Sequence, residues 1–180
     1  MSCLAVSDSL LLVVDMQARL LPAIRDGQDV LARAQSLAQA ACLLGVPVMA
    51  TEHCVEKIGA TVPQLQAFIP RIVRKTHFDA TREPGFAAQL PKARPNVLLI
   101  GTEAHVCVLQ TAIGLMALGL RPILVADCVG SRRLSDLQAA INRAVHHHIE
   151  VVTSEMAMFE WLETGDSEHF KAVLALIKSH

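Results

Sequence analysis

The sequence predicts an α/β fold: a Rossmann-like, three-layer αβα sandwich around a mainly parallel, six-stranded sheet. Short runs rich in Leu and β-branched residues alternate with longer helical patterns, which is typical of βαβ units. The first run, LLLVVD at 10–15, is continuously apolar up to its carboxylate, as expected of a strand buried on both faces. Two helical patterns end at Gly45 and Gly119, and glycine commonly follows the last turn of a helix.

The expected elements follow one another in a regular order along the chain. Further strands are expected at 46–52, 71–75, 96–101, 121–127 and 149–153. Helices are expected at 28–45, 61–68, 105–119, 135–148, 154–163 and 167–178. No linker, repeat or low-complexity segment interrupts this pattern, so we expect a single domain over 1–180.

Composition indicates how the chain associates. Of its 180 residues, 52% are apolar and 18% are charged, a more apolar balance than in a typical domain. Because a chain this short cannot bury all of that surface alone, we expect a homo-oligomer, a tetramer or larger. Lys and Arg number 16 against 17 Asp and Glu, and Tyr is absent, which argues against nucleic-acid and membrane partners.

The five cysteines favour a reducing compartment, because their number is odd and none forms a C-x-x-C pair. The N-terminal stretch MSCLAVSDSLLLVVDMQ lacks a basic region, and its apolar run is far too short to cross a bilayer. We therefore expect a cytoplasmic protein.

Three strand-end residues form the candidate site, because ligands of open α/β sheets bind at the carboxyl ends of the strands. Asp15 ends the first strand, Lys75 ends the third, and Cys107 begins the helix after the fourth. Singly, each has a structural interpretation as a capping carboxylate, a solvated lysine or a packed thiol. Together they fit acyl transfer, in which the carboxylate takes the thiol proton and the lysine holds the carboxylate.

The position of Cys107 adds two expectations. The positive end of the helix dipole is expected to favour its thiolate. Backbone N–H groups at 103–107 are expected to form an oxyanion hole.

Three motifs occur in a fixed order: DMQ at 15–17, KTHFDA at 75–80 and GTEAHVCVLQTA at 101–112. This set resembles the isochorismatase-like cysteine hydrolase superfamily. The similarity is greatest to its metal-free branch of isochorismatase-domain proteins, and it covers nearly the whole chain through 51–65, 125–127 and 151–162.

The resemblance implies roles for named residues. Asp15 matches the catalytic acid/base, Lys75 the third triad member and Cys107 the nucleophile. A cis peptide bond is implied between Thr102 and Glu103, turning backbone N–H groups toward the oxyanion. The expected oxyanion and cis-peptide residues are Thr102, Glu103 and Val106. The expected pocket residues are Gln17, His77, Phe78 and His105, each with an alternative as a capping, solvated or packing residue.

Two departures from the superfamily pattern bear on the chemistry. Where nicotinamidases carry a D-x-H metal motif, this chain has His53 and Val55, so we expect no metal and no cofactor. True isochorismate hydrolases lack the active-site cysteine, so Cys107 indicates hydrolysis of a small amide or imide through a thioester.

Two other interpretations remain beside this hypothesis. The chain is alternatively a silent oligomeric scaffold or a small-molecule-binding protein whose cysteine is incidental or redox-sensitive. A dinucleotide-binding role is disfavoured, because the first strand–helix turn, DMQARLLPA, has no glycine fingerprint. The run His146–His148 is not expected to bind metal, since consecutive helical positions point in different directions.

Overall fold

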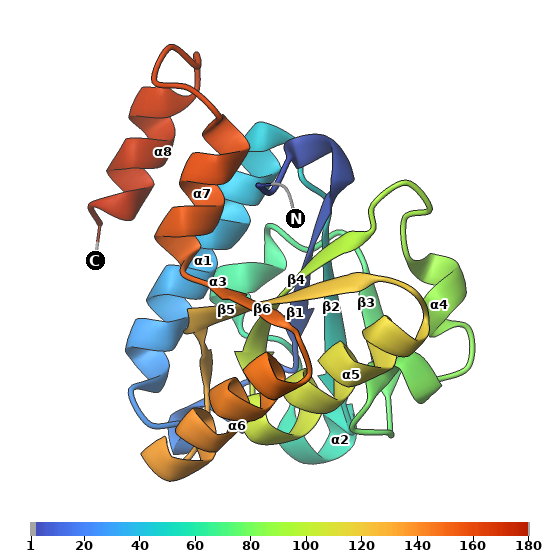
Figure 1. Cartoon of the computed structure of the whole chain (residues 1–180). Coiled ribbons are helices and arrows are strands. Elements are labelled where there is room, and N and C mark those ends of the chain that lie inside the picture. The colour runs from blue at the N-terminus through green and yellow to red at the C-terminus, as the bar shows by residue number, and fades with distance from the viewer. Residues whose placement is uncertain (1–2, 180) are drawn as a thin grey trace.

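The computed structural model describes residues 3–179, which form a six-stranded parallel sheet flanked by helices (Figure 1). All five strand pairings are parallel. The strands are β1 (Ser9–Val14), β2 (Val48–His53), β3 (Ile72–Lys75), β4 (Asn96–Thr102), β5 (Arg121–Gly130) and β6 (Glu150–Val152). The predicted α/β class and six-stranded sheet are confirmed.

The strand order β3-β2-β1-β4-β5-β6 defines where a ligand would bind. The chain builds the sheet outward from β1 to β3, then returns to β4 on the other side of β1. Ligands of doubly wound sheets bind outside the carboxyl ends of the strands at such a switch point. The candidate site is therefore the edge where β1 and β4 end, at the bottom of Figure 1.

Eight α-helices surround the sheet in the described part of the chain. They are α1 (Gly27–Leu44), α2 (Val55–Ile58), α3 (Pro63–Gln66), α4 (Phe86–Gln89), α5 (Leu109–Ala117), α6 (Leu134–His146), α7 (Ser154–Leu162) and α8 (Phe170–Ile177). Short 3-10 turns are η1 (Val6–Asp8), η2 (Leu21–Ala23) and η3 (Ala80–Arg82), and η4 (Ala104–Val108) is a π-helix.

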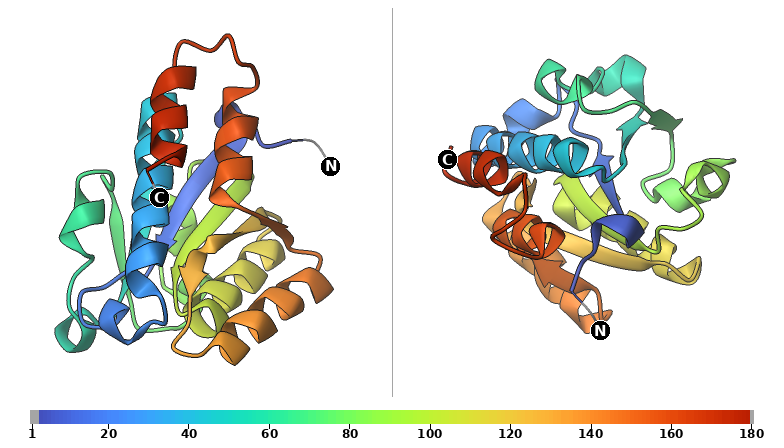
Figure 2. Two further views of the ribbon diagram at one scale, coloured as in Figure 1. Left: turned by 90° about the vertical axis from the view of Figure 1, so that its left-hand side faces the viewer. Right: turned by 90° about the horizontal axis from the view of Figure 1, so that it is seen from above.

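Alternating strand residues pack into two hydrophobic clusters on opposite faces of the sheet. In β1, Leu11 and Val13 belong to one cluster, and Leu10, Leu12 and Val14 to the other. Helices α1, α7 and α8 cover the first face, while α5 and α6 cover the second (Figures 1 and 2). Burial on both faces explains the continuously apolar run at the start of the chain.

The structure differs from the predicted elements in three places. The helix expected at 105–119 begins as the π-helix η4, because the Leu109 N–H reaches the Ala104 carbonyl, and becomes α-helical only at Leu109. The strand expected at 121–127 continues to Gly130, which pairs with Thr102 beyond a register shift in β4. Helices α2 and α4 have four residues each, too few to show an apolar period.

Gly101 allows β1 and β4 to lie close together at the switch point. Its φ is +127°, a conformation that side-chain-bearing residues rarely adopt. A Cβ at this position would lie 1.9 Å from the Val14 carbonyl oxygen. A side chain here would therefore push apart the two strands that carry Asp15 and Cys107.

Within residues 3–179, the helices are either too short or too polar to span a bilayer.

Candidate active site

The three strand-end residues meet at the carboxyl edge of the sheet. Asp15 directly follows β1, Lys75 is the last residue of β3, and Cys107 lies in η4 just after β4. Because β2 separates β1 from β3, the Lys75 side chain reaches across β2 to the carboxylate of Asp15. Residues that are between 32 and 92 positions apart in the sequence thus form one site.

Asp15 is fully buried, and both of its carboxylate oxygens have partners. Lys75 Nζ donates to Oδ2 at 2.7 Å, and Thr51 Oγ1 donates to Oδ1 at 2.7 Å. Asp15 also has a positive φ of 49°, uncommon for a residue other than glycine. These contacts supply the pairing that a carboxylate requires when it is removed from water.

Lys75 is equally buried, and its side chain has no exposed surface. Besides Asp15, its ammonium group donates to the carbonyl oxygens of His77 at 3.1 Å and Phe78 at 3.3 Å. Three acceptors match the three N–H donors of an ammonium group. The lysine is therefore held in one orientation as a buried charged group, unlike the solvated alternative.

Cys107 lies in the same electrostatic environment as this ion pair and is 6% exposed. Burial, followed by the negative charge of Asp15, raises the pKa of the thiol to about 12, and the positive charge of Lys75 opposes the rise. Hydrogen bonds to Asp15 and Lys75 contribute smaller, opposing effects. The shift is therefore opposite in direction to the expected stabilisation of the thiolate, because burial and the carboxylate both favour the neutral thiol.

The peptide bond between Thr102 and Glu103 is cis, the isomer that the resemblance implied. The side chains of these two residues form hydrogen bonds with neighbouring residues. Thr102 Oγ1 donates to the carbonyl oxygen of Asp15 at 2.8 Å, and Arg132 Nε donates to Glu103 Oε1 at 2.7 Å. The Val106 N–H already donates to the Glu103 carbonyl at 3.1 Å, so this geometry does not support the expected oxyanion role of Val106.

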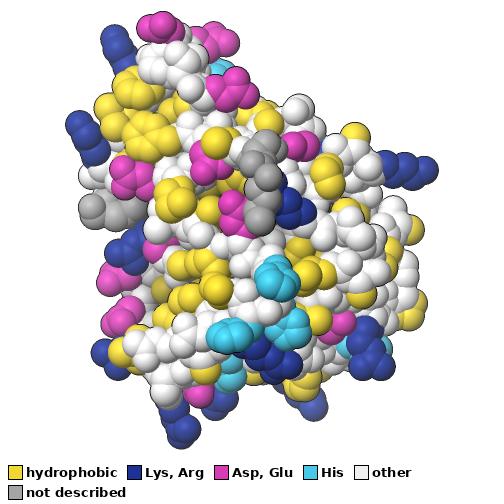
Figure 3. Space-filling model, viewed as in Figure 1, with side chains coloured by type: hydrophobic (Ala, Val, Ile, Leu, Met, Phe, Trp, Pro, Cys, Tyr) yellow, Lys and Arg dark blue, Asp and Glu magenta, His cyan; other side chains and the backbone are white. Residues whose placement is uncertain are grey.

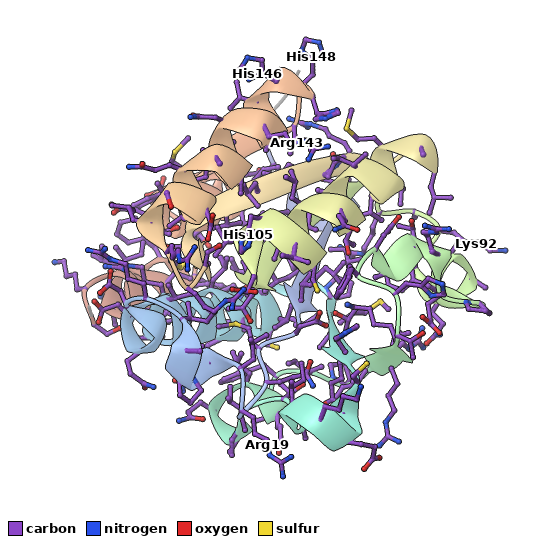
Figure 4. All side chains as sticks on the ribbon, turned by 90° about the horizontal axis from the view of Figure 1, so that it is seen from below. Arg19, Lys92, His105, Arg143, His146 and His148 are labelled. Carbon is purple, nitrogen blue, oxygen red and sulfur yellow. The ribbon has the colours of Figure 1, made fainter. Side chains whose placement is uncertain are left out.

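The expected pocket residues have different environments. Gln17 is buried, and its side chain bonds to the backbone of His53 and Gly59, which holds the loop after β2. His77 is exposed and pairs with Glu83 at 2.9 Å. Seen from below, His105 lies near the middle of the molecule (Figure 4), and its Nδ1 is 3.0 Å from Ser131 Oγ.

Phe78 is half exposed and stacks on a residue that sequence reasoning did not include in the site, His53. The two ring centroids are 5.2 Å apart. Burial, and then the positive charge of Lys75, lowers the pKa of His53. Thr51, two residues earlier on β2, was also missed, although the two-residue spacing of Thr51 and His53 places both on one face of the strand.

Two cavities flank the site on the side of β3. The larger, of about 450 Å³, is lined by Glu52, Cys54, Val55, Glu56, Lys57, Arg74, Lys75, Thr76 and Glu83. A smaller one, of about 250 Å³, is lined by Thr76, His77, Phe78, Asp79, Arg82 and Gln110. Cys107 lines neither cavity.

No three His, Cys, Asp or Glu side chains within residues 3–179 are grouped to hold a metal ion. Glu52, at the position next to the nicotinamidase motif, instead accepts hydrogen bonds from Thr61 N at 2.7 Å and Thr61 Oγ1 at 2.8 Å. Its carboxylate thus holds the loop before α3.

Known proteins share this architecture. The isochorismatase domain model matches residues 9–156. Isochorismatase domain-containing protein 1 of Salmo salar is 38% identical over 92% of this chain, which spans 59% of that protein's length. The structure of the MAR1 ribonuclease from Caenorhabditis elegans is 31% identical, with a TM-score of 0.91 over 98% of this chain and 92% of that one. The YcaC gene product of Escherichia coli, an octameric hydrolase of unknown specificity, has the same fold at 24% identity and a TM-score of 0.85, over 97% of this chain and 88% of that one.

By its fold and its relatives, this chain is similar to the isochorismatase-like hydrolases, a class of α/β proteins. The chain belongs to the isochorismatase family.

Proposed function

We propose that the protein is a cysteine-dependent hydrolase that cleaves the C–N bond of a small amide or imide through a thioester on Cys107. The observation that carries this proposal is the buried pair of Asp15 and Lys75, 2.7 Å apart, in whose field the thiol lies. Buried ion pairs are expensive to form, and a perturbed titratable group beside one at a sheet switch point favours a functional role.

The proposed reaction begins from the thiol and the carboxylate. As the sulfur attacks the substrate carbonyl carbon, the thiol proton moves to Asp15, and the S–C bond forms. Asp15 then returns the proton to the departing nitrogen as the C–N bond breaks. Water attacks the thioester, its proton passes through Asp15 to the sulfur, and the C–S bond breaks to release the acid.

Lys75 has two functions in this scheme. Its charge holds the Asp15 carboxylate in place through Oδ2, and it lowers the energy of the thiolate that forms during attack. Because the pKa of the thiol is about 12, the resting site holds a neutral thiol. In the proposed scheme the proton moves to Asp15 as the sulfur attacks.

We also propose that the protein works as a homo-oligomer, a tetramer or larger. Large apolar side chains are exposed on α5, α6 and α7, including Met116, Val145, Met156 and Phe159. Figure 3 shows hydrophobic side chains gathered over α7 and α8 on one face. The octameric E. coli relative has the same fold, which supports an assembly of several copies.

A catalytically silent scaffold or small-molecule-binding protein is the alternative. A thiol of high pKa that is 6% exposed also fits a packing role. This alternative predicts that Cys107 never carries an acyl group.

RNA cleavage is a second activity to test, because the C. elegans relative is named a ribonuclease. The near-equal numbers of basic and acidic residues offer little electrostatic attraction for a polyanion. We therefore favour a small-molecule substrate over RNA.

The test is product formation from a panel of small amides and cyclic imides, with intact-mass detection of an acyl adduct. We expect turnover in the native protein, a loss of at least about 10³-fold in C107A and in D15N, and native rates in C42A, a control at an exposed cysteine on α1. Turnover by C107A would refute the mechanism. A native protein that stays unacylated and inactive across the panel would establish the scaffold alternative, and RNA cleavage lost in C107A would establish the nuclease.

A further inference from the structure

One buried polar atom in the site has no partner. Among the side chains of residues 3–179, His53 Nδ1 is the one buried nitrogen or oxygen without a hydrogen bond. Leaving a buried acceptor or donor unpaired costs free energy, so such an atom in a native site calls for an explanation. A ligand that completes the hydrogen bond would supply one.

The backbone register places His53 beside the catalytic groups. His53 pairs with Lys75 between β2 and β3, so both side chains lie on the same face of the sheet. Thr51, which donates to Asp15, precedes His53 by two residues and lies on that face as well. Met49 and Val73, on the same face of these strands, pack in one cluster with Cys107.

His53 also lies between the buried pair and the surface. On one side it is within the electrostatic influence of Lys75 and Asp15, and on the other its ring stacks on the half-exposed Phe78. The imidazole is therefore next to a partly exposed side chain, Phe78, and within the field of the buried pair.

A neutral imidazole has one nitrogen that donates a hydrogen bond and one that accepts. Burial, and then the charge of Lys75, lowers the pKa of His53, so the ring is neutral at pH 7. The backbone of His77 acts on this pKa in the opposite direction. With the proton on Nε2, Nδ1 carries a lone pair and no hydrogen.

We propose that His53 is a substrate-binding residue whose Nδ1 accepts a hydrogen bond from the amide nitrogen of the substrate, restricting the site to amides with a free N–H. This inference rests on the proposed amide hydrolysis and specifies its substrate class. Primary carboxamides fit best, because one N–H can bind His53 while the carbonyl carbon faces Cys107. Esters and N,N-disubstituted amides have no such hydrogen and would leave Nδ1 unpaired.

The direct test uses binding, without turnover. C107A protein labelled with ¹⁵N-histidine is titrated with propionamide and, as a matched control, with N,N-dimethylpropionamide, while the His53 Nδ1 resonance is followed. The resonance is assigned from its disappearance in H53L. We expect an upfield shift with propionamide only. The inference would be overturned by the absence of a shift or by an equal shift with both amides. It would also be overturned if Nδ1 were already hydrogen-bonded in the free protein, because a water molecule would then be its partner and the histidine would be structural.

Variants separate binding from a structural role. In H53L the unpaired polar atom is removed, so we expect an unchanged or higher Tm together with about a tenfold rise in KM for a primary amide, with kcat changed less. H53N retains an acceptor near the Nδ1 position and should recover part of the affinity. A fall in Tm with unchanged KM in H53L would assign His53 to the packing of the site instead.

Failure of this inference is distinguishable from failure of the proposed function. A propionamide-specific shift in a protein that hydrolyses no amide would support His53 and refute the hydrolase. Turnover with no shift would retain the hydrolase and refute the role of His53.

Discussion

Replacing Asp15 with Asn should make the Cys107 thiol more acidic while abolishing turnover. Burial is the first cause of the raised pKa of the thiol and the charge of Asp15 is the second. Asn has the same shape without the charge, so it removes the second cause and leaves the first. The expected result is a variant with more thiolate and less activity, because the proton acceptor is lost with the charge.

The magnitude follows from the charges at the site. With a pKa of about 12, about 1% of the native thiol is ionised at pH 10. Removing a neighbouring like charge should lower the pKa by about one to two pH units, which raises the thiolate fraction at pH 10 to about 10–50%. Lys75→Met should act oppositely, because the ammonium lowers the pKa of the thiol. In the double variant, with Asp15→Asn and Lys75→Met, burial remains the main cause of the raised pKa of Cys107.

Thiolate absorbance near 240 nm measures this pKa directly, because the chain contains no Tyr to ionise in the same range. Each variant is titrated from pH 6 to 10.5. The absorbance of the same variant carrying Cys107→Ala is subtracted, which removes the contribution of the other cysteines. Circular dichroism at each pH verifies that the fold persists. An inflection for native Cys107 below pH 8.5, or less thiolate in D15N than in the native protein, would refute the electrostatic reasoning.

Three further results are expected. Lys75→Met should lower the free energy of unfolding by about 3–5 kcal/mol in a denaturant titration, since it leaves a buried carboxylate unpaired; a loss below about 1 kcal/mol would indicate that water reaches the pair. Gly101→Ala should cost about 4 kcal/mol or more because its Cβ meets a backbone oxygen, whereas Gly119→Ala, with positive φ and open space, should cost about 1–2 kcal/mol; similar losses would contradict the close-approach argument. Because burial and the charge of Lys75 lower the pKa of His53, the folded protein binds fewer protons at this residue than the unfolded chain does. The free energy of unfolding should therefore fall as pH drops below about 6.5. H53L should lose this part of the pH dependence, and an unchanged slope in H53L would refute the assignment to His53.

The buried pair depends on three neighbouring strands. Lys75 at the end of β3 reaches across β2 to Asp15 after β1, and Thr51 on β2 completes the carboxylate shell. The same strand carries His53, so β2 provides both the support of the carboxylate and the candidate contact to substrate.

Much of the fold was predictable from the sequence, because hydrophobic periodicity is a local property. The continuously apolar strands and the glycines after the helices are readable within windows of a few residues. The positions of Asp15 and Lys75 at strand ends were predictable for the same reason. Their meeting at one edge followed from the general rule for parallel sheets.

The tertiary structure alone decided how these groups interact. No local pattern indicates that His53 lies beside Lys75, since this depends on the register between β2 and β3. The acidity of Cys107 was mispredicted because the helix terminus is visible in the sequence, whereas burial and the nearby carboxylate are not. The sequence by itself determined the sheet, the strand ends and the candidate residues, because these depend on neighbours along the chain. Only the structure decided the charge state of the thiol and the unpaired nitrogen of His53, because both depend on neighbours in space.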